Sequence, residues 1–205
     1  MITLIKKDMY FCRKYILIAL LFSLAAPILL VVDGDGLYQL LSFYVPMVVT
    51  GVVFGKMCYT DDSDDVRMFL RSLPYKRSKF IASKFIELFL INAISIIYVS
   101  VIQIILNKGI NTTSTLKINI LVGAFFIFYY SIYLFLYFKN NYYAAQNTMY
   151  IVLAVVFVCV FASNRNLLSN INMNWLFNNS VVAIILGIAI IIYTASMYII
   201  IKGEK

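Results

Sequence analysis

The stretch INILVGAFFIFYYSIYLFLYF, residues 118–138, carries no charged side chain and decides the fold class. A helix that spans the hydrocarbon core of a bilayer needs about 20 apolar residues, and this stretch is long enough. Five other stretches have the same character, so we expect an all-α integral membrane protein that forms a single transmembrane domain over residues 1–205. Its six transmembrane helices are expected at about 15–32, 36–55, 85–107, 118–138, 141–163 and 181–201.

The composition of the whole chain agrees with this class. Hydrophobic residues make up 63% of its 205 residues, against roughly 45 to 50% in an ordinary soluble domain. Charged residues make up only 13%, where about 25% is usual. A water-facing surface cannot be covered with so few polar side chains, so a soluble globular protein is excluded.

The sequence also lacks the residues that several chemistries need. There is no histidine, and Cys12, Cys58 and Cys159 are too far apart for CxxC spacing, so a metal site has no usual ligands. The glycines form neither GxxxxGK[ST] nor GxGxxG, and the only acid near a span is Glu87. We therefore expect no catalytic residue, no metal and no cofactor in this chain, and any ATP and Mg²⁺ belong to a partner.

The distribution of Lys and Arg predicts the orientation. Of the 17 basic residues, 14 fall in the N-terminus, the segment 56–84, the turn at Lys139 and the C-terminus. The opposite loops hold only Lys108, Lys117 and Arg165. The positive-inside rule then places both termini in the cytoplasm of a multi-pass cell-membrane protein. Because the positive charge falls where topology demands it, we expect no nucleic-acid partner.

Aromatic residues follow one face of the fourth span. Phe126, Tyr129, Tyr133 and Tyr137 recur at three- and four-residue spacing. Two interpretations are open: Tyr129, Tyr133 and Tyr137 line a path for a flexible amphipathic substrate, or the rings pack against neighbouring helices.

Small and polar residues in the spans also allow two roles. Gly51 and Gly55 form a GxxxG motif, which favours close helix packing either within the bundle or between two protomers. Polar residues within the spans line a substrate path or bond one helix to another. They include Asn92, Ser95, Gln103, Ser131, Gln146 and Asn147.

The cytoplasmic segment 56–84 is the one sizeable piece of the chain outside the expected spans. Asp61 to Asp65 supply N-cap candidates, and apolar residues then follow at helical spacing until Pro74 ends the helix. The apolar residues are Val66, Phe69, Leu70 and Leu73. The pattern predicts a two-turn helix with one apolar face and with arginines at positions 67 and 71.

A second helix is expected to begin at Lys79, capped by Ser78, and to run without a break into the third span. At 1.5 Å per residue it is about 42 Å long, more than the roughly 30 Å of the hydrocarbon core. The third span therefore projects from the membrane. Two interpretations of the segment remain: the short helix docks on a partner, or the segment contacts anionic lipid. The basic residues available for lipid are Lys76, Arg77, Lys79 and Lys84.

The N-terminus is amphipathic. On a helical wheel Ile2, Ile5, Met9 and Cys12 fall together, while Lys7, Tyr10 and Lys14 lie opposite. We expect an interfacial helix that leads into the first span.

The run from Leu70 to Lys84, LRSLPYKRSKFIASK, resembles the pattern of Ser-Leu-Pro, basic residues and Ser-Lys between the second and third spans of ABC-2 type transporter permeases. The half-size peptide and bacteriocin exporters of Gram-positive bacteria, which include the phenol-soluble modulin exporter, belong to this family, and the chain resembles them. The six-span layout is similar along the whole chain. Two features depart from the family pattern: an Asp-rich cluster stands where a glutamate is usual, and Arg71 where an apolar residue is common.

The resemblance implies the roles of the parts. The short helix is the coupling helix, which docks on a separate cytoplasmic ABC ATPase, and the N-terminal helix is similar to the family's elbow helix. Two permease copies, or one copy and a homologue, pair to form a path for an amphipathic or hydrophobic substrate such as a peptide. The ATPase contact falls on Val66, Arg67, Phe69, Leu70, Arg71, Leu73 and Pro74. The competing hypothesis is a non-transporting immunity, assembly or sensor subunit, which needs no ATPase.

Overall fold

A computed structural model describes residues 2–33, 38–63, 66, 68, 76–106, 112–164 and 178–203. The elements are α1 (Ile2–Phe11), α2 (Arg13–Asp33), α3 (Tyr38–Asp61), α5 (Arg77–Leu106), α6 (Thr112–Lys139), α7 (Tyr142–Asn164) and α8 (Asn179–Gly203). These described ranges contain helices and no strand, which confirms the all-α fold class.

Four of these helices are long and apolar enough to cross a membrane: α3 over Leu41–Asp61, α5, α6 and α8, among the residues that the structure describes. α2 and α7, with 21 and 23 residues, lie where the first and fifth spans were expected. The tight turn expected between the fourth and fifth spans is present, since α6 ends at Lys139 and α7 begins at Tyr142. The Asn141 side chain accepts a hydrogen bond from the Ala144 amide at 2.9 Å and caps α7.

One helix boundary differs from the expectation. α5 begins at Arg77, two residues before Lys79, so Ser78 lies inside the first turn and does not cap the helix. The Lys79 amide instead bonds to the Lys76 carbonyl at 2.8 Å. With 30 residues, α5 is about 45 Å long at 1.5 Å per residue. It remains longer than a hydrocarbon core, as the sequence predicted.

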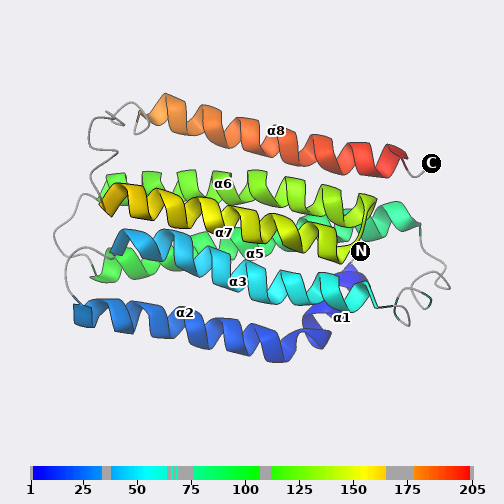
Figure 1. Ribbon diagram of the computed structural model, residues 1–205, viewed down its shortest axis with the longest axis horizontal. Coiled ribbons are helices and arrows are strands. Elements are labelled where there is room, and N and C mark those ends of the chain that lie inside the picture. The colour runs from blue at the N-terminus through cyan, green and yellow to red at the C-terminus, as the bar shows by residue number, and fades with distance from the viewer. Residues whose placement is uncertain are drawn as a thin grey trace.

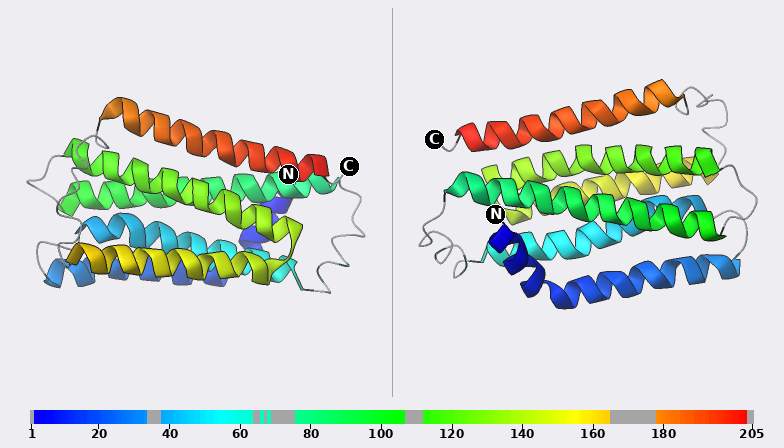
Figure 2. Two further views of the ribbon diagram at one scale, coloured as in Figure 1. Left: turned by 45° about the horizontal axis from the view of Figure 1, so that its top comes forward. Right: turned by 180° about the vertical axis from the view of Figure 1, so that it is seen from behind.

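The long helices lie side by side in a bundle, as Figure 1 shows, with α2 and α8 at opposite edges. α6 is central, because it packs against α3, α5, α7 and α8. The end of the bundle that carries Lys7, Lys56, Lys84, Lys139 and Lys202 is called the basic end below. α1 lies across this end next to α5, which is clearest from behind in Figure 2.

α5 turns polar side chains into the bundle, while several of its apolar side chains face outward. Ile94 is 65% exposed, whereas Asn92 and Gln103 are buried. The Gln103 amide donates to Ser42 at 2.9 Å and accepts from the Asn119 amide at 2.8 Å, so one side chain joins α3, α5 and α6. This arrangement suits a lipid surrounding, where polar side chains connect helices. For Gln103, helix-to-helix bonding is therefore confirmed.

Candidate functional site

Five charged side chains meet at the basic end in what we call the charge cluster: Lys7, Asp8, Asp61, Lys84 and Glu87. They come from α1, from the last residue of α3, and from the first turns of α5. Lys84 and Asp8 are 0% and 4% exposed. The cluster therefore joins three elements that are far apart in the sequence.

The ion pairs of the charge cluster form a closed ring. Lys84 Nζ lies 2.7 Å from Asp8 Oδ2 and 3.7 Å from Glu87 Oε2, and it also pairs with Asp61. Lys7 Nζ lies 2.9 Å from Asp8 Oδ1 and 3.2 Å from Asp61 Oδ1. Each aspartate thus bridges the same two lysines. Displacing any one of the three elements breaks contacts to both of the others.

The electrostatics of the charge cluster depend on these partners. Burial by itself lowers the pKa of Lys7, but Asp61 and Asp8 outweigh burial, so the pKa of Lys7 is raised above its ordinary value. A fully buried ammonium such as Lys84 is tolerable only when carboxylates compensate its lost hydration. The described residues hold no group of acids, cysteines or histidines arranged as metal ligands. The cluster is therefore a set of mutual ion pairs.

The charge cluster corrects two sequence-based expectations. Lys84 was grouped with the lipid-contacting basic residues, but it is buried and its ammonium group is taken up by acids. Asp61 was an N-cap candidate for the short helix, but it ends α3 and pairs with both lysines. Both corrections have one physical cause. α1 folds back across the basic end and brings Lys7 and Asp8 to residues 61 and 84.

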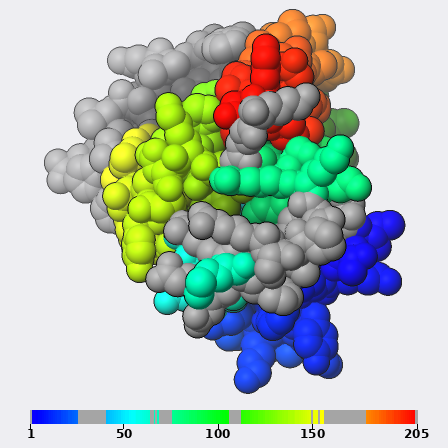
Figure 3. All heavy atoms as spheres, turned by 90° about the vertical axis from the view of Figure 1, so that its right-hand side faces the viewer, coloured from blue at the N-terminus to red at the C-terminus, as the bar shows by residue number. Residues whose placement is uncertain are grey.

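The segment between Asp61 and Lys84 is described in part. Val66 and Met68 are helical, in line with the expected short helix, whereas Arg67, Phe69, Leu70, Arg71, Leu73 and Pro74 lie outside the described residues. Val66 is half-buried and lines a cavity of about 90 Å³ against α1 and α3. Lys76, Arg77 and Lys79 are exposed. Figure 3 looks onto the basic end, where the start of α5 lies beside α1.

α1 carries its apolar side chains on the outside. Ile2 is 72% and Met9 44% exposed, while Asp8 points into the bundle. Tyr10, on the face expected to be polar, is 76% exposed, so the two faces are not divided as the helical wheel predicts, and the interfacial role of α1 stays a prediction. Cys12, directly after α1, is buried, and this burial raises the pKa of its thiol to about 11. It is therefore an unreactive thiol at neutral pH.

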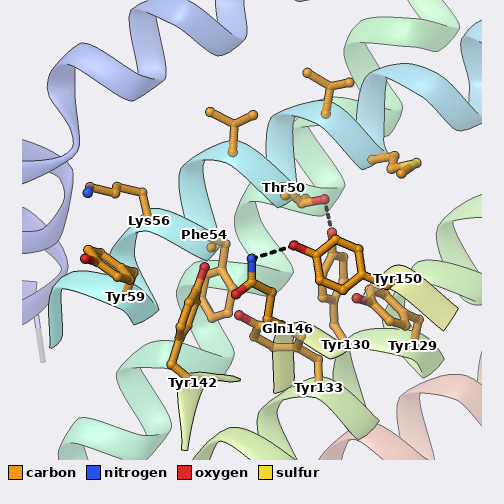
Figure 4. A pocket seen from close by; sticks show the side chains of 15 residues that line it. Thr50, Phe54, Lys56, Tyr59, Tyr129, Tyr130, Tyr133, Tyr142, Gln146 and Tyr150 are labelled. Carbon is orange, nitrogen blue, oxygen red and sulfur yellow. Dashed lines mark hydrogen bonds between the residues drawn. The ribbon is translucent and has the colours of Figure 1, made fainter. Parts of the chain in front are cut away.

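A second feature is a groove of about 510 Å³ between α3, α6 and α7, drawn in Figure 4. Tyr129 and Tyr133 of the expected aromatic path line it, together with Tyr130. Tyr137 does not line it, and its hydroxyl donates to the Cys58 carbonyl at 3.4 Å. All three path residues are buried in the main apolar core, and of these Tyr129 and Tyr133 border the groove.

The GxxxG motif lies on the same groove. Gly51 and Gly55 both line it, and a Cβ atom added to Gly55 would meet nothing within 4 Å. Gly55 therefore makes no close helix contact with the part of the chain that the structure describes. By contrast, a Cβ on Gly123 would lie 3.4 Å from Ile96, which marks a tight approach of α6 to α5.

The chain belongs to the ABC-2 family of transporter proteins, whose family model matches residues 3–203. It is thus the multi-pass membrane permease subunit of an ABC transporter, a transport subunit that associates with an ABC ATPase. No curated protein and no solved structure is similar enough to this chain to count as a match.

Proposed function

We propose that this permease is the membrane half of an ATP-driven exporter for an amphipathic or hydrophobic substrate. In this proposal the basic end faces the cytoplasm, where 14 of the 17 Lys and Arg residues lie on the expected inner side. The likeness of the sequence to half-size peptide exporters favours a peptide as the substrate. Tyr129 and Tyr133, in the groove, are the proposed substrate contacts.

The charge cluster is the observation that carries the proposal. The segment with the proposed coupling residues leaves α3 after Asp61 and rejoins the bundle in α5, close before Lys84. Both ends of the segment are thus fixed to each other and to α1 by buried ion pairs. A push on the segment by a docked ATPase would move α1, α3 and α5 together. Such a device converts motion of a soluble partner into motion of membrane helices.

A permease of this size pairs with a second copy or a homologue in the proposed exporter. Gly51 and Gly55 are the proposed protomer contact, in which the second chain covers the open side of the groove that they line. The exposed Lys76, Arg77 and Lys79 are proposed to contact anionic headgroups around the docked ATPase.

The direction of transport can be measured in inside-out vesicles that contain the permease and its ATPase. An exporter moves substrate from the exposed cytoplasmic side into the vesicle lumen. We expect an amphipathic peptide with a fluorescent label to accumulate with ATP and not with ADP. ATP-dependent loss of preloaded peptide from the same vesicles would reverse the proposed direction.

The orientation is testable with single cysteines in a Cys159→Ser background. The native Cys12 and Cys58 are buried, so neither is a useful probe of sidedness. In intact cells we expect Lys202→Cys, exposed at the basic end, to resist an impermeant thiol reagent. Thr113→Cys, exposed at the opposite end, should react with it. The reverse pattern would contradict the cytoplasmic placement of the basic end.

A further inference from the structure

The groove ends at Lys56, a cation with no acidic partner among the residues that the structure describes. Lys56 Nζ lies 4.4 Å from the centre of the Tyr59 ring and 5.2 Å from that of Tyr15, and it forms no ion pair with any described residue. Two ring faces hold the ammonium group in place without neutralising it. An incoming anion would find this charge already positioned.

The polarity of the groove changes along α3. At the basic end it is lined by Lys56, Tyr59 and Gln146, and farther along α3 by Met47 and Val48. The distance from residue 47 to 59 along a helix is about 18 Å. This gradient matches one leaflet of a bilayer, with charged and aromatic groups at the headgroup level and apolar groups beneath it.

The groove is long and slender. A volume of about 510 Å³ spread over that length accommodates a single extended chain. The absence of side chains at Gly51 and Gly55 forms part of this space.

From these features we propose that the groove binds a single-chain amphiphile with an anionic headgroup. The headgroup lies against Lys56, and the apolar chain runs along Val52 and Val48 towards Met47. This groove also holds the proposed substrate contacts, so a role of the ligand in export rests on the proposed function. The binding of the ligand to the groove is independent of that function.

The test uses photo-crosslinking of the full chain, with its ATPase, in phosphatidylcholine nanodiscs. The probe is an alkyl phosphate with a diazirine in its chain, and the corresponding alcohol is the neutral comparison. We expect the phosphate to label groove residues of α3, α6 and α7, as mapped by mass spectrometry. Lys56→Gln should reduce this labelling about tenfold, as expected for a lost charge-assisted hydrogen bond. Labelling of the wild-type protein by the neutral alcohol should be as weak as labelling of the Lys56→Gln variant by the phosphate.

Two matched controls separate the groove from the surface. Lys139→Gln removes another lysine of the basic end, whose ammonium lies over Phe135 outside the groove, and should leave the labelling within about twofold. Gly55→Leu fills the groove and should abolish labelling. Gly187→Leu is its control: Gly187 lies on α8 with equally open space beside it, so this variant should keep its labelling.

Equal labelling by phosphate and alcohol, or no effect of Lys56→Gln, would overturn the inference. The inference would also be overturned if an apolar peptide displaced the probe equally well with a free C-terminus and with an amidated one. The groove would then not select for an anion. ATPase association and ATP-dependent transport are scored on the same preparations. If a preparation transports substrate but its labelling does not depend on Lys56, the inference alone is rejected. If labelling depends on Lys56 but the preparation neither binds its ATPase nor transports, the proposed function alone is rejected.

Discussion

Replacing Lys84 with methionine is expected to destabilise the bundle by about 3 to 5 kcal/mol, the usual cost of removing one partner from a buried ion pair. Methionine occupies a similar volume but leaves Asp8 and Asp61 buried with only the half-exposed Lys7 between them. The measurement is thermal unfolding in detergent, together with the yield of folded protein. A loss of this size is comparable to the whole stability of many domains, so a low yield is expected too.

Lys139→Met is the matched control, because Lys139 is exposed at the same end and its removal should change stability by less than about 0.5 kcal/mol. A triple variant, Lys84→Met with Asp8→Asn and Asp61→Asn, removes the two aspartates along with the lysine and leaves Lys7 and Glu87 in the cluster. It should recover part of the stability, since uncharged substitutes for a buried ion pair are often neutral. If the ion pairs also transmit force, the triple variant folds but loses ATP-driven transport. A triple variant with full transport would leave the charge cluster a structural role only.

Much of the fold follows from the sequence because membrane helices obey a simple length rule. Uncharged stretches such as 118–138 have to be helical in lipid, since no water is available to bond the backbone. The ends of the helices are harder to predict. Ser78 has the chemistry of an N-cap, but α5 continues to Arg77 outside the expected span, where sequence periodicity no longer constrains the start.

The charge cluster was not predicted because its charges lie in three separate parts of the chain. Lys7, Asp8 and Asp61 each look like ordinary surface charges beside a span. A partial signal was present in α5, where Lys84, Asn92 and Gln103 fall on one helical face and are all buried. A polar stripe on an otherwise apolar span indicates an inward face. It does not identify the partners, because the path of α1 across the basic end depends on tertiary packing.

The residues that line the groove could also be predicted only in part. The aromatic periodicity of residues 126 to 137 was visible in the sequence, but the rings of Tyr133 and Tyr137 serve different surroundings in the structure. Which of them lines a groove is decided by α3 and α7. The helical repeat identifies a face, and neighbouring helices decide which part of that face stays open.

Truncating Phe69 and Leu70 together to alanine is expected to weaken ATPase association by more than tenfold. In the proposed coupling helix these two side chains form the centre of a small apolar contact, where single truncations often cost 2 kcal/mol or more. Each 1.4 kcal/mol corresponds to a tenfold change in affinity. The membrane bundle should still fold, because its buried clusters are built from the long helices. The measurements are ATPase co-purification and ATP-dependent transport at matched expression.

The matched control is Lys76→Gln with Arg77→Gln, which removes two exposed charges from the same segment. If these residues contact only headgroups, the variant should keep its ATPase and lose part of its affinity for anionic membranes, about 1 kcal/mol for each charge. The comparison separates docking from lipid contact because both variants change the same short segment in different chemical ways. Should the Phe69 and Leu70 variant retain its ATPase and its transport while the basic variant loses stability in membranes, the segment is a lipid-contacting loop. The force proposed to reach the charge cluster would then have to enter the bundle elsewhere.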